Sequence, residues 1–356
     1  MGRPWLRPRT LMAITRLNIT EFLRKSQEGF LIDVRSPSEY RHAHMPGAYS
    51  LPLFNDEERK VVGTSYKQHS RENAIKIGLD FFGPKMRSMV DQVELWMKEL
   101  AMDPKQTSVF VHCWRGGMRS AGVAWLLDLY GFKVFTLHGG YKAFRGFINE
   151  QLNTHYTINI LGGRTGAGKT RFLKNAATQN LQVLDLEGLA NHKGSSFGKT
   201  SGEQPTQEAF ENLLGLALAK VSANKAIWVE DESARIGDVQ VPINFWNQMR
   251  AAKVYYVDIP FEERLQYLEQ DYATVPTDDL RSATSRIAKR LGGLETKNVL
   301  NYLTEGNRKE AFRILLRYYD KWYDLGLQKR GQENIIRFEF ESHDVFDWKK
   351  LTHGEN

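Results

Sequence analysis

The segment Gly163-Arg164-Thr165-Gly166-Ala167-Gly168-Lys169-Thr170 decides the fold of the second half of the chain. It fits the pattern G-x-x-x-x-G-K-[ST] and follows the apolar run Thr157–Leu161, which is typical of a buried strand. In such a phosphate-binding loop (P-loop) the glycines let backbone N–H groups turn toward phosphate oxygens, and the lysine adds a positive charge. We therefore predict that Gly163, Gly166, Gly168, Lys169 and Thr170 bind phosphate, with the Thr170 hydroxyl available to Mg²⁺.

Acidic residues follow two other apolar runs of this half, and ligands of parallel sheets bind beyond the carboxyl ends of the strands. The run Ala226–Val229 ends in Glu230-Asp231-Glu232. We predict Asp231 as the carboxylate that orients a metal ion, with Glu230 and Glu232 as open alternatives. Asp185 follows the run Leu181–Leu184 and is expected to face the same site, as is the segment 192–198. The alternative reading is a solvated acidic strand end.

Short apolar runs alternate with amphipathic stretches through both halves, which predicts parallel sheets covered by helices. In the first half we expect strands at Phe30–Val34, Ala48–Leu51, Ser108–Val111 and Lys133–Thr136. In the second half the last expected strand is Val254–Asp258, and the pattern turns mainly helical after Pro260. The sequence therefore predicts two α/β domains, at residues 17–150 and 155–356, of which the second is a P-loop domain with a helical C-terminal region.

The composition limits the class of protein and of partner. The 356 residues are 41% hydrophobic and 26% charged, which suits two globular domains. No run of about eighteen apolar residues occurs, so we expect a soluble protein without membrane contact. The single cysteine, Cys113, excludes an internal disulfide and indicates a reducing compartment, the cytoplasm. The formal net charge of +7 favours an anionic partner such as nucleic acid, although a solvated basic surface is the alternative.

The cysteine lies in the loop Cys113-Trp114-Arg115-Gly116-Gly117-Met118-Arg119-Ser120, between an expected strand and an expected helix. Backbone N–H groups, the N-terminus of the helix and the neighbouring Arg115 and Arg119 all favour a thiolate over a thiol. A thiolate is the species that accepts sulfur or selenium. We therefore predict Cys113 as a catalytic thiol assisted by the two arginines, against the alternative of a buried structural cysteine.

The segments around this loop resemble a known family. Leu31-Ile32-Asp33-Val34-Arg35-Ser36-Pro37-Ser38-Glu39-Tyr40 and His44-Met45-Pro46-Gly47-Ala48 are similar to the opening signature of rhodanese-like domains. The resemblance covers roughly residues 17–145, and in that family the cysteine carries a persulfide. It implies a rhodanese-like fold for the first domain. Asp33 and Arg35 are expected to support this fold as an ion pair.

The combination with a P-loop domain, together with finer motifs, resembles the tRNA 2-selenouridine synthases over nearly the whole chain. The motifs are 55–59, 62–68, 139–143, 185–198 and 230–233. The resemblance implies a tRNA substrate with 2-thiouridine at the wobble position, in tRNAs for Lys, Glu and Gln. Selenophosphate would donate selenium to Cys113, and an S-geranylated thiouridine would be the intermediate. The P-loop would then hold geranyl diphosphate, with no bound organic cofactor, and a selenophosphate-producing enzyme becomes a possible partner.

Basic residues on two expected helices are candidates for tRNA binding. From Arg308 to about Leu325, an apolar face is formed by Phe312, Leu315, Leu316, Tyr319 and Tyr323, and we expect it to be core. Arg313, Arg317 and Lys321 form a row on a neighbouring face, which Lys329 and Arg330 extend. Arg286, Lys289 and Arg290 are expected to close over an anionic leaving group or to contact the tRNA. A solvated basic face is the alternative for both sets.

Two rival functions remain open at this point. One is an ATP-dependent tRNA sulfurtransferase, because a P-loop binds a nucleotide for the same reasons that it binds a diphosphate. The other is a non-catalytic P-loop module whose rhodanese-like domain serves as a sulfide or redox sensor. The arginines beside Cys113 argue against the second.

Overall fold

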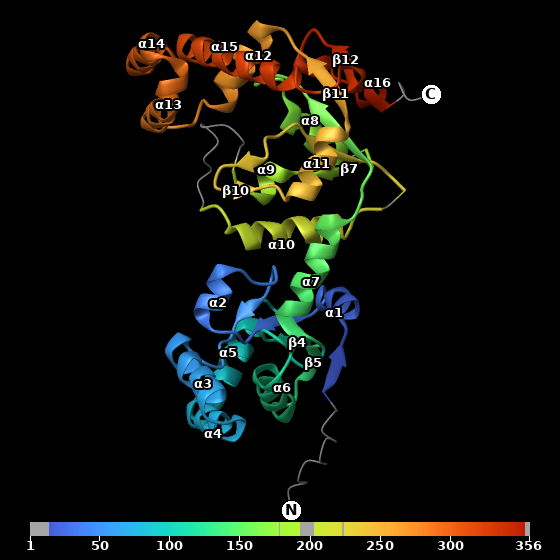
Figure 1. Ribbon diagram of the computed structural model, residues 1–356, viewed down its shortest axis with the longest axis vertical. Coiled ribbons are helices and arrows are strands. Elements are labelled where there is room, and N and C mark those ends of the chain that lie inside the picture. Colours follow the sequence, from blue (N-terminus) through green and yellow to red (C-terminus); the bar gives the residue numbers. More distant parts are fainter. Residues whose placement is uncertain (1–13, 178, 193–202, 223, 353–356) are drawn as a thin grey trace, which may run out of the picture. The chain divides into compact units, whose positions relative to one another are not determined.

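The computed structural model describes residues 14–177, 179–192, 203–222 and 224–352 (Figure 1). The predicted segment 192–198 therefore lies outside the described residues beyond His192. The chain divides into two compact units, which meet in sequence between Glu150 and Gln151, inside helix α7 (Gly140–Asn153). Each unit is built on its own parallel sheet, so the α/β class predicted for both halves is confirmed.

The first unit contains a five-stranded parallel sheet in the order β1-β5-β4-β2-β3. The strands are β1 (Thr15–Leu17), β2 (Phe30–Asp33), β3 (Tyr49–Ser50), β4 (Ser108–His112) and β5 (Lys133–Leu137). Strand β4 lies between β2 and β5, and its residues 109–112 are buried, as expected for a central strand covered on both faces. Cys113 follows directly, at the carboxyl end of this central strand.

Helices cover this sheet on both faces. They are α1 (Ile19–Ser26), α2 (Pro37–His42), α3 (Asp56–Gln68), α4 (Arg71–Phe82), α5 (Met86–Glu99) and α6 (Met118–Tyr130), with α7 closing the unit. Buried residues of α5 and α6, such as Val93 and Val123, pack with Val111 of the sheet in one hydrophobic core, which also contains Cys113. The sulfur therefore lies at the border between this core and the loop that begins α6.

The second unit contains a five-stranded parallel sheet in the order β12-β11-β6-β8-β7. The strands are β6 (Ile158–Gly162), β7 (Gln182–Leu184), β8 (Ile227–Glu230), β11 (Lys253–Asp258) and β12 (Ile335–Glu339). Strands β9 (Arg235–Ile236) and β10 (Val239–Gln240) follow β8 in the sequence and form a separate antiparallel pair. Because β8 pairs directly with β6, Glu230 stands opposite Leu161, two residues before the P-loop.

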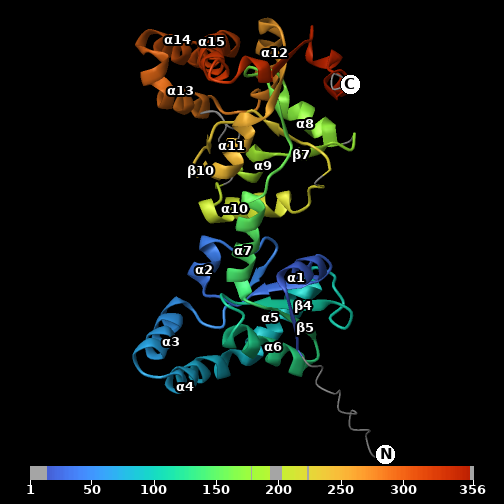
Figure 2. The same cartoon turned by 45° about the vertical axis from the view of Figure 1, so that its right-hand side comes forward.

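The helices of the second unit fall into two groups. Those around the sheet are α8 (Lys169–Ala177), α9 (Leu186–Leu189), α10 (Gln207–Leu218), α11 (Ile243–Ala251) and α16 (Trp348–Thr352). The helical region expected after Pro260 comprises α12 (Phe261–Asp271), α13 (Thr277–Leu291), α14 (Gly293–Thr304) and α15 (Arg308–Leu327), which lie side by side in Figure 2. These four helices share a core of their own and are inserted between β11 and β12. None of the helices in the described ranges has the length and apolarity needed to cross a membrane.

Candidate functional site

The P-loop joins β6 to α8 and adopts a backbone that requires glycine. Gly166 and Gly168 both have φ of 78°, in the left-handed region that L-residues with a side chain avoid. A Cβ at Gly168 would lie 2.9 Å from the His343 ring, and His343 Nε2 itself lies 2.8 Å from the Gly166 carbonyl oxygen. The loop therefore has the fixed, close-packed backbone that its sequence predicts.

The side chains of Lys169 and Thr170 converge on Glu230. Lys169 Nζ donates to the Gly163 carbonyl oxygen at 2.9 Å and lies 3.5 Å from a Glu230 carboxylate oxygen. The Thr170 hydroxyl donates to the other oxygen of Glu230 at 3.0 Å. Glu230 is buried at the end of β8. It is therefore the carboxylate that meets the two functional side chains of the P-loop.

The prediction that Asp231 has this role requires correction. The Asp231 carboxylate is bound by the guanidinium of Arg330 and by the hydroxyl of Tyr323, the latter at 3.0 Å. Both carboxylates line the cavity, but it is the Glu230 carboxylate that contacts Lys169 and Thr170. Arg330, which we expected on a basic surface, is buried and also donates to the Met249 carbonyl oxygen.

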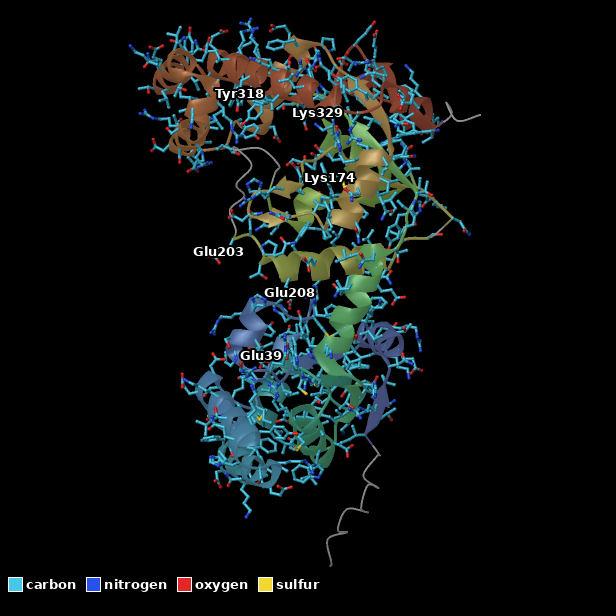
Figure 3. All side chains as sticks on the ribbon, viewed as in Figure 1. Glu39, Lys174, Glu203, Glu208, Tyr318 and Lys329 are labelled. Atoms are coloured by element: carbon cyan, nitrogen blue, oxygen red, sulfur yellow. The ribbon has the colours of Figure 1, made fainter. Side chains whose placement is uncertain are left out.

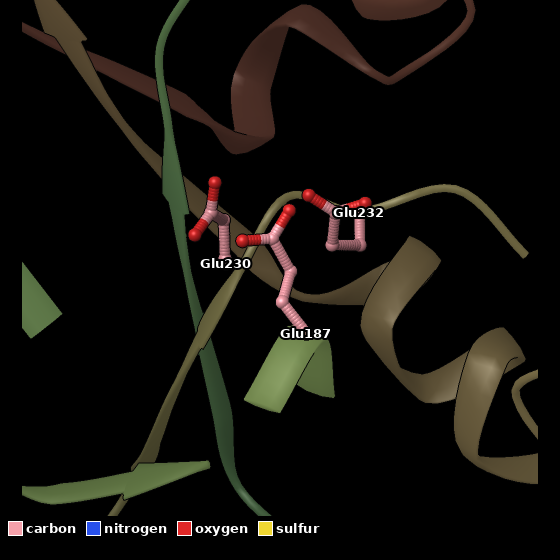
Figure 4. A group of neighbouring side chains, drawn as sticks. All are labelled: Glu187, Glu230 and Glu232. Atoms are coloured by element: carbon pink, nitrogen blue, oxygen red, sulfur yellow. The ribbon is translucent and has the colours of Figure 1, made fainter. Parts of the chain in front are cut away.

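Three carboxylates form a cluster beside the loop: Glu187, Glu230 and Glu232, with one ligand oxygen each lying within 4.8 Å of the others (Figure 4). Burial, reinforced by Glu230 and Glu187, raises the pKa of Glu232 well above its ordinary value. Carboxylate and hydroxyl oxygens are the ligands of hard divalent cations. The donor set of Glu230 and Thr170, with Glu187 and Glu232 near, therefore fits the Mg²⁺ that the sequence predicts.

Asp185 does not belong to this cluster. Its side chain is exposed and accepts a hydrogen bond from the Gly188 backbone N–H at 2.8 Å, so it caps the N-terminus of α9. Glu187, two residues later, lines the cavity instead. The sequence therefore indicated the right strand, β7, but it did not indicate that Glu187 lines the cavity in place of Asp185.

A cavity of about 970 Å³ opens next to the P-loop. Its lining includes the polar side chains of Lys169, Thr170 and the three carboxylates. It also includes aromatic side chains of α11, α12, α15 and the turn after α12, namely Trp246, Tyr267, Tyr272, Tyr319, Trp322 and Tyr323. Lys174 and Lys329, both exposed, also line it and are labelled in Figure 3. The cavity thus suits a ligand with an anionic head and an apolar body.

Helix α15 is fastened to the P-loop by residues on one of its faces. The Tyr323 hydroxyl accepts a hydrogen bond from the Gly163 N–H at 2.8 Å, and Asp324 pairs with Arg164 at 3.0 Å. One turn earlier, Asp320 pairs with the buried Arg264, which also donates to the Thr165 carbonyl oxygen. The expected apolar face of this helix is core at Phe312, Leu315 and Leu316, whereas Tyr319 and Tyr323 line the cavity.

The basic row predicted on α15 is only partly available for a ligand. Arg313 forms ion pairs with Glu262 and Glu310, so its charge is already compensated. Arg317 and Lys321 are exposed. On α13, Arg286 and Arg290 are exposed as well, and neither they nor Lys289 belong to the lining of the cavity, so the predicted closure over a leaving group finds no support in the described residues.

The Cys113 thiol is buried, with 3% of the residue exposed. Its sulfur lies 3.2 Å from the Ser120 hydroxyl oxygen, at the start of α6. Arg119, predicted to assist the sulfur, instead donates to a Glu39 carboxylate oxygen at 3.0 Å. Burial would raise the pKa of Glu39, but the Arg119 guanidinium and hydrogen bonds hold it below its ordinary value. Arg115 is exposed and makes no ion pair within the part of the chain that the structure describes.

The first residues of α7 are hydrogen-bonded to the cysteine loop. The Tyr141 N–H donates to the Cys113 carbonyl oxygen at 2.8 Å, and the Lys142 N–H donates to that of Trp114 at 2.9 Å. Gly140 has φ of 58°, and a Cβ there would lie 2.2 Å from the Cys113 carbonyl oxygen. The sequence analysis assigns no role to this segment, although it belongs to the motif 139–143. The signal for such a role is the pair of adjacent glycines, Gly139 and Gly140, at the start of a helix.

A buried ion pair supports the same turn. Arg35 pairs with Asp33 at 2.7 Å, and its guanidinium carbon lies 3.7 Å from the centroid of the Tyr141 ring. Both charged groups are withdrawn from solvent, and the Ala43 carbonyl oxygen accepts a further hydrogen bond from Arg35. The supporting role expected for Asp33 and Arg35 agrees with these contacts, which reach the cysteine loop through Tyr141.

Known proteins resemble this chain over most of its length. Residues 156–355 match a family model described as the tRNA 2-selenouridine synthase AAA domain, and residues 18–146 match the rhodanese-like domain. A tRNA 2-selenouridine synthase of Hydrogenovibrio crunogenus is 38% identical, covering 84% of this chain and 90% of the relative. Proteins of the same name from Shewanella denitrificans and Pseudomonas syringae pv. tomato are 34% and 35% identical. Their matches cover 86% and 82% of this chain, and 90% and 87% of the relatives.

The Gly140 turn yields a testable prediction about the cysteine. Gly140→Ala places a methyl group against the Cys113 carbonyl oxygen, in a backbone conformation that costs alanine about 1–3 kcal/mol. The closed loop is destabilised, so alkylation of Cys113 by iodoacetamide should accelerate by roughly tenfold. Gly146→Ala is the matched control, because it lies in the same helix with open space around its Cβ. Equal alkylation rates for the two variants would contradict the proposed support of the loop.

Proposed function

The chain belongs to the tRNA 2-selenouridine synthase family, and on that premise we propose how its two units divide the reaction. Its substrate is tRNA. We infer that it replaces the sulfur of a wobble-position 2-thiouridine by selenium, with selenophosphate as the donor and S-geranyl-2-thiouridine as the intermediate. The observation that carries this division is a cavity lined both by the phosphate-binding loop and by aromatic side chains, in a chain whose other unit contains a cysteine at the carboxyl end of its central strand.

The aromatic wall favours geranyl diphosphate over a nucleotide as the ligand of the P-loop. Both ligands offer a diphosphate, so the loop itself does not distinguish them. A geranyl chain, however, is hydrocarbon throughout, and burying it against Tyr319, Trp322 and Tyr323 removes apolar surface from water. Aromatic faces also stabilise the positive charge that develops on an allylic carbon as its diphosphate leaves.

The first step forms a carbon–sulfur bond. The sulfur of 2-thiouridine attacks carbon 1 of the geranyl group, the carbon–oxygen bond to diphosphate breaks, and the base loses its N3 proton. Backbone N–H groups of the P-loop and Lys169 would hold the departing diphosphate, and Lys169 would exchange its contacts with Gly163 and Glu230 for phosphate oxygens. Thr170 and Glu230 would hold Mg²⁺, which would offset part of the diphosphate charge.

The second step replaces sulfur by selenium. A thiocarbonyl sulfur is a poor leaving group, whereas the alkylated sulfur departs as geranyl thiol when selenium bonds to carbon 2. Cys113 would carry the selenium as a selanyl group. Selenophosphate would release selenide as its phosphate passes to water, and a small-molecule disulfide would accept the two electrons lost when the sulfur–selenium bond forms. Two thiols would return these electrons when the selenium passes to carbon 2, which regenerates the Cys113 thiol and the disulfide. Because the chain has one cysteine, no internal thiol competes for that selenium by exchange. The loop after Cys113 must open for this step, since the sulfur is buried as the loop stands.

The partners proposed from the family are tRNAs for Lys, Glu and Gln, together with an enzyme that produces selenophosphate. The formal net charge of +7 and the exposed Arg317, Lys321 and Lys329 support tRNA binding, and the single cysteine supports a cytoplasmic site of action. Family membership disfavours the sensor module. It also disfavours the ATP-dependent sulfurtransferase. Hydrolysis of ATP by the pure protein would be the evidence for that alternative.

Cys113→Ser should abolish the formation of 2-selenouridine and leave geranylation intact, because a hydroxyl of similar size cannot carry selenium. The measurement is mass spectrometry of nucleosides from thiolated tRNA incubated with geranyl diphosphate and selenophosphate. S-geranyl-2-thiouridine should accumulate with the variant. Normal selenation by Cys113→Ser would remove the cysteine from the reaction.

Lys169→Ala should weaken the binding of geranyl diphosphate by roughly 10- to 100-fold, which is the loss expected for charge-assisted hydrogen bonds of about 1.5–3 kcal/mol. Calorimetric titration measures it. The control is Lys225→Ala, an exposed lysine outside the cavity lining. Selenation of tRNA that is already geranylated should be much less affected. If Lys169→Ala impaired that second step alone, the P-loop would serve selenophosphate or ATP instead of geranyl diphosphate.

A further inference from the structure

Helix α3 in the first unit carries an unusual separation of charge. Its acidic residues all lie in the first turn, and from Arg59 to Arg71, at the start of α4, the chain contains no acidic residue. Over the same stretch it contains Arg59, Lys60, Lys67 and Arg71. Two of the three acids of the first turn are also engaged, since Glu58 pairs with Lys85 and Asp56 accepts hydrogen bonds from Ser38, whereas Glu57 is exposed. The rest of the helix therefore presents positive charge.

The orientation of α3 places the lysines on its outer side. Ser65 is buried and accepts a hydrogen bond from the Asn73 side chain at 3.0 Å, which fixes the inner side against α4. Lys60, Gly63 and Lys67 lie opposite, with Thr64 at the edge of the same side, and all four are exposed. We call these four residues the α3 crest. Within the described part of the chain, neither lysine of the crest forms an ion pair.

The crest has a shape that suits a nucleic acid backbone. Lys60 and Lys67 are two turns apart, about 10 Å along the helix axis. Gly63 stands between them with open space where a side chain would be, so a phosphate chain can approach the helix closely. On the adjacent flank, Tyr66 is 54% exposed and offers an aromatic face on which an unpaired base can stack.

Helix α3 is also connected, through Arg59, to the helix that follows the cysteine loop. One oxygen of Glu39 accepts hydrogen bonds from both Arg59 of α3 and Arg119 of α6, each at 3.0 Å. The first basic residue of α3 is thus held one side chain away from the helix that begins after Cys113. A polyanion lying on α3 would pass next to the loop that must deliver selenium.

We propose that the α3 crest, with Tyr66 beside it, binds the phosphate backbone of the tRNA arm that carries the wobble uridine. Phosphate contacts of this kind fix the position and orientation of an RNA without reading its sequence. The crest would hold the anticodon arm while carbon 2 of the wobble uridine is presented to Cys113. This inference rests on the proposed function, because it takes tRNA as the substrate. An RNA is favoured over an acidic protein for two reasons. The two lysines and the open space at Gly63 suit a phosphate backbone, and the exposed aromatic ring suits an unpaired base.

The test is the salt dependence of tRNA binding by the full chain. Lys60→Glu with Lys67→Glu should weaken binding of thiolated tRNA and reduce the slope of log affinity against log salt by about 1.4–1.8, for two lost phosphate contacts. Lys98→Glu with Lys105→Glu is the matched control, because these exposed lysines of the same unit give the same change in net charge. Tyr66→Ala should weaken binding while leaving the salt slope unchanged.

The outcomes separate this inference from the function on which it rests. If the wild type binds tRNA and the Lys60/Lys67 variant has the same affinity and slope, the crest does not contact the RNA. If that variant keeps tRNA binding but loses selenium transfer from a selenophosphate-producing enzyme, the crest receives an acidic protein, which equally overturns the proposal. If the wild type shows no salt-dependent tRNA binding, the proposed function fails as well. Unchanged thermal unfolding and unchanged geranyl diphosphate binding establish that the variant is folded.

Discussion

The phosphate site depends on the buried carboxylate of Glu230. A charge taken out of water must be paired, and Glu230 finds its partners in the Thr170 hydroxyl and the Lys169 ammonium. This pairing is possible because β8 lies directly beside β6, so that its last residue ends next to the P-loop. The same contacts hold Lys169 ready at the loop, where phosphate oxygens can replace the carboxylate and carbonyl oxygens that it now meets. Around this centre, α15 supplies both a brace for the loop, through Tyr323 and Asp324, and part of the aromatic wall.

The two units fit a reaction in which activation precedes replacement. Sulfur at position 2 leaves easily only after alkylation, so a site for an apolar diphosphate and a site for selenium belong together in one chain. The first unit must instead shield its cysteine from other thiols. Its cysteine is covered by a loop whose carbonyl oxygens are bound by the N-terminal amides of α7, and the buried pair Asp33–Arg35 supports that helix through Tyr141. Selenium on a shielded sulfur is protected from other thiols until the loop opens.

Local motifs could be predicted from the sequence, and contacts between distant residues could not. The P-loop was identifiable because its backbone and its chemistry are encoded in eight adjacent residues. The choice between Glu230 and Asp231 depends on which carboxylate contacts Lys169 and Thr170, and two adjacent acidic residues carry no sign of this in the sequence. Arg313 and Arg119 looked available because their partners, Glu262 and Glu39, are 51 and 80 residues away. Tyr319 and Tyr323 follow the apolar period of α15, but periodicity does not distinguish a packed core from the wall of a cavity.

The most direct test of the central claim follows the nucleosides of a thiolated tRNA through the two steps. The purified protein is given geranyl diphosphate alone, selenophosphate alone, or both, without ATP and in a buffer that contains a small thiol and its disulfide, and the digested tRNA is analysed by mass spectrometry. The account predicts S-geranyl-2-thiouridine with geranyl diphosphate alone, unchanged 2-thiouridine with selenophosphate alone, and 2-selenouridine when both are present. Formation of 2-selenouridine from selenophosphate without geranyl diphosphate, or only on addition of ATP, would contradict it.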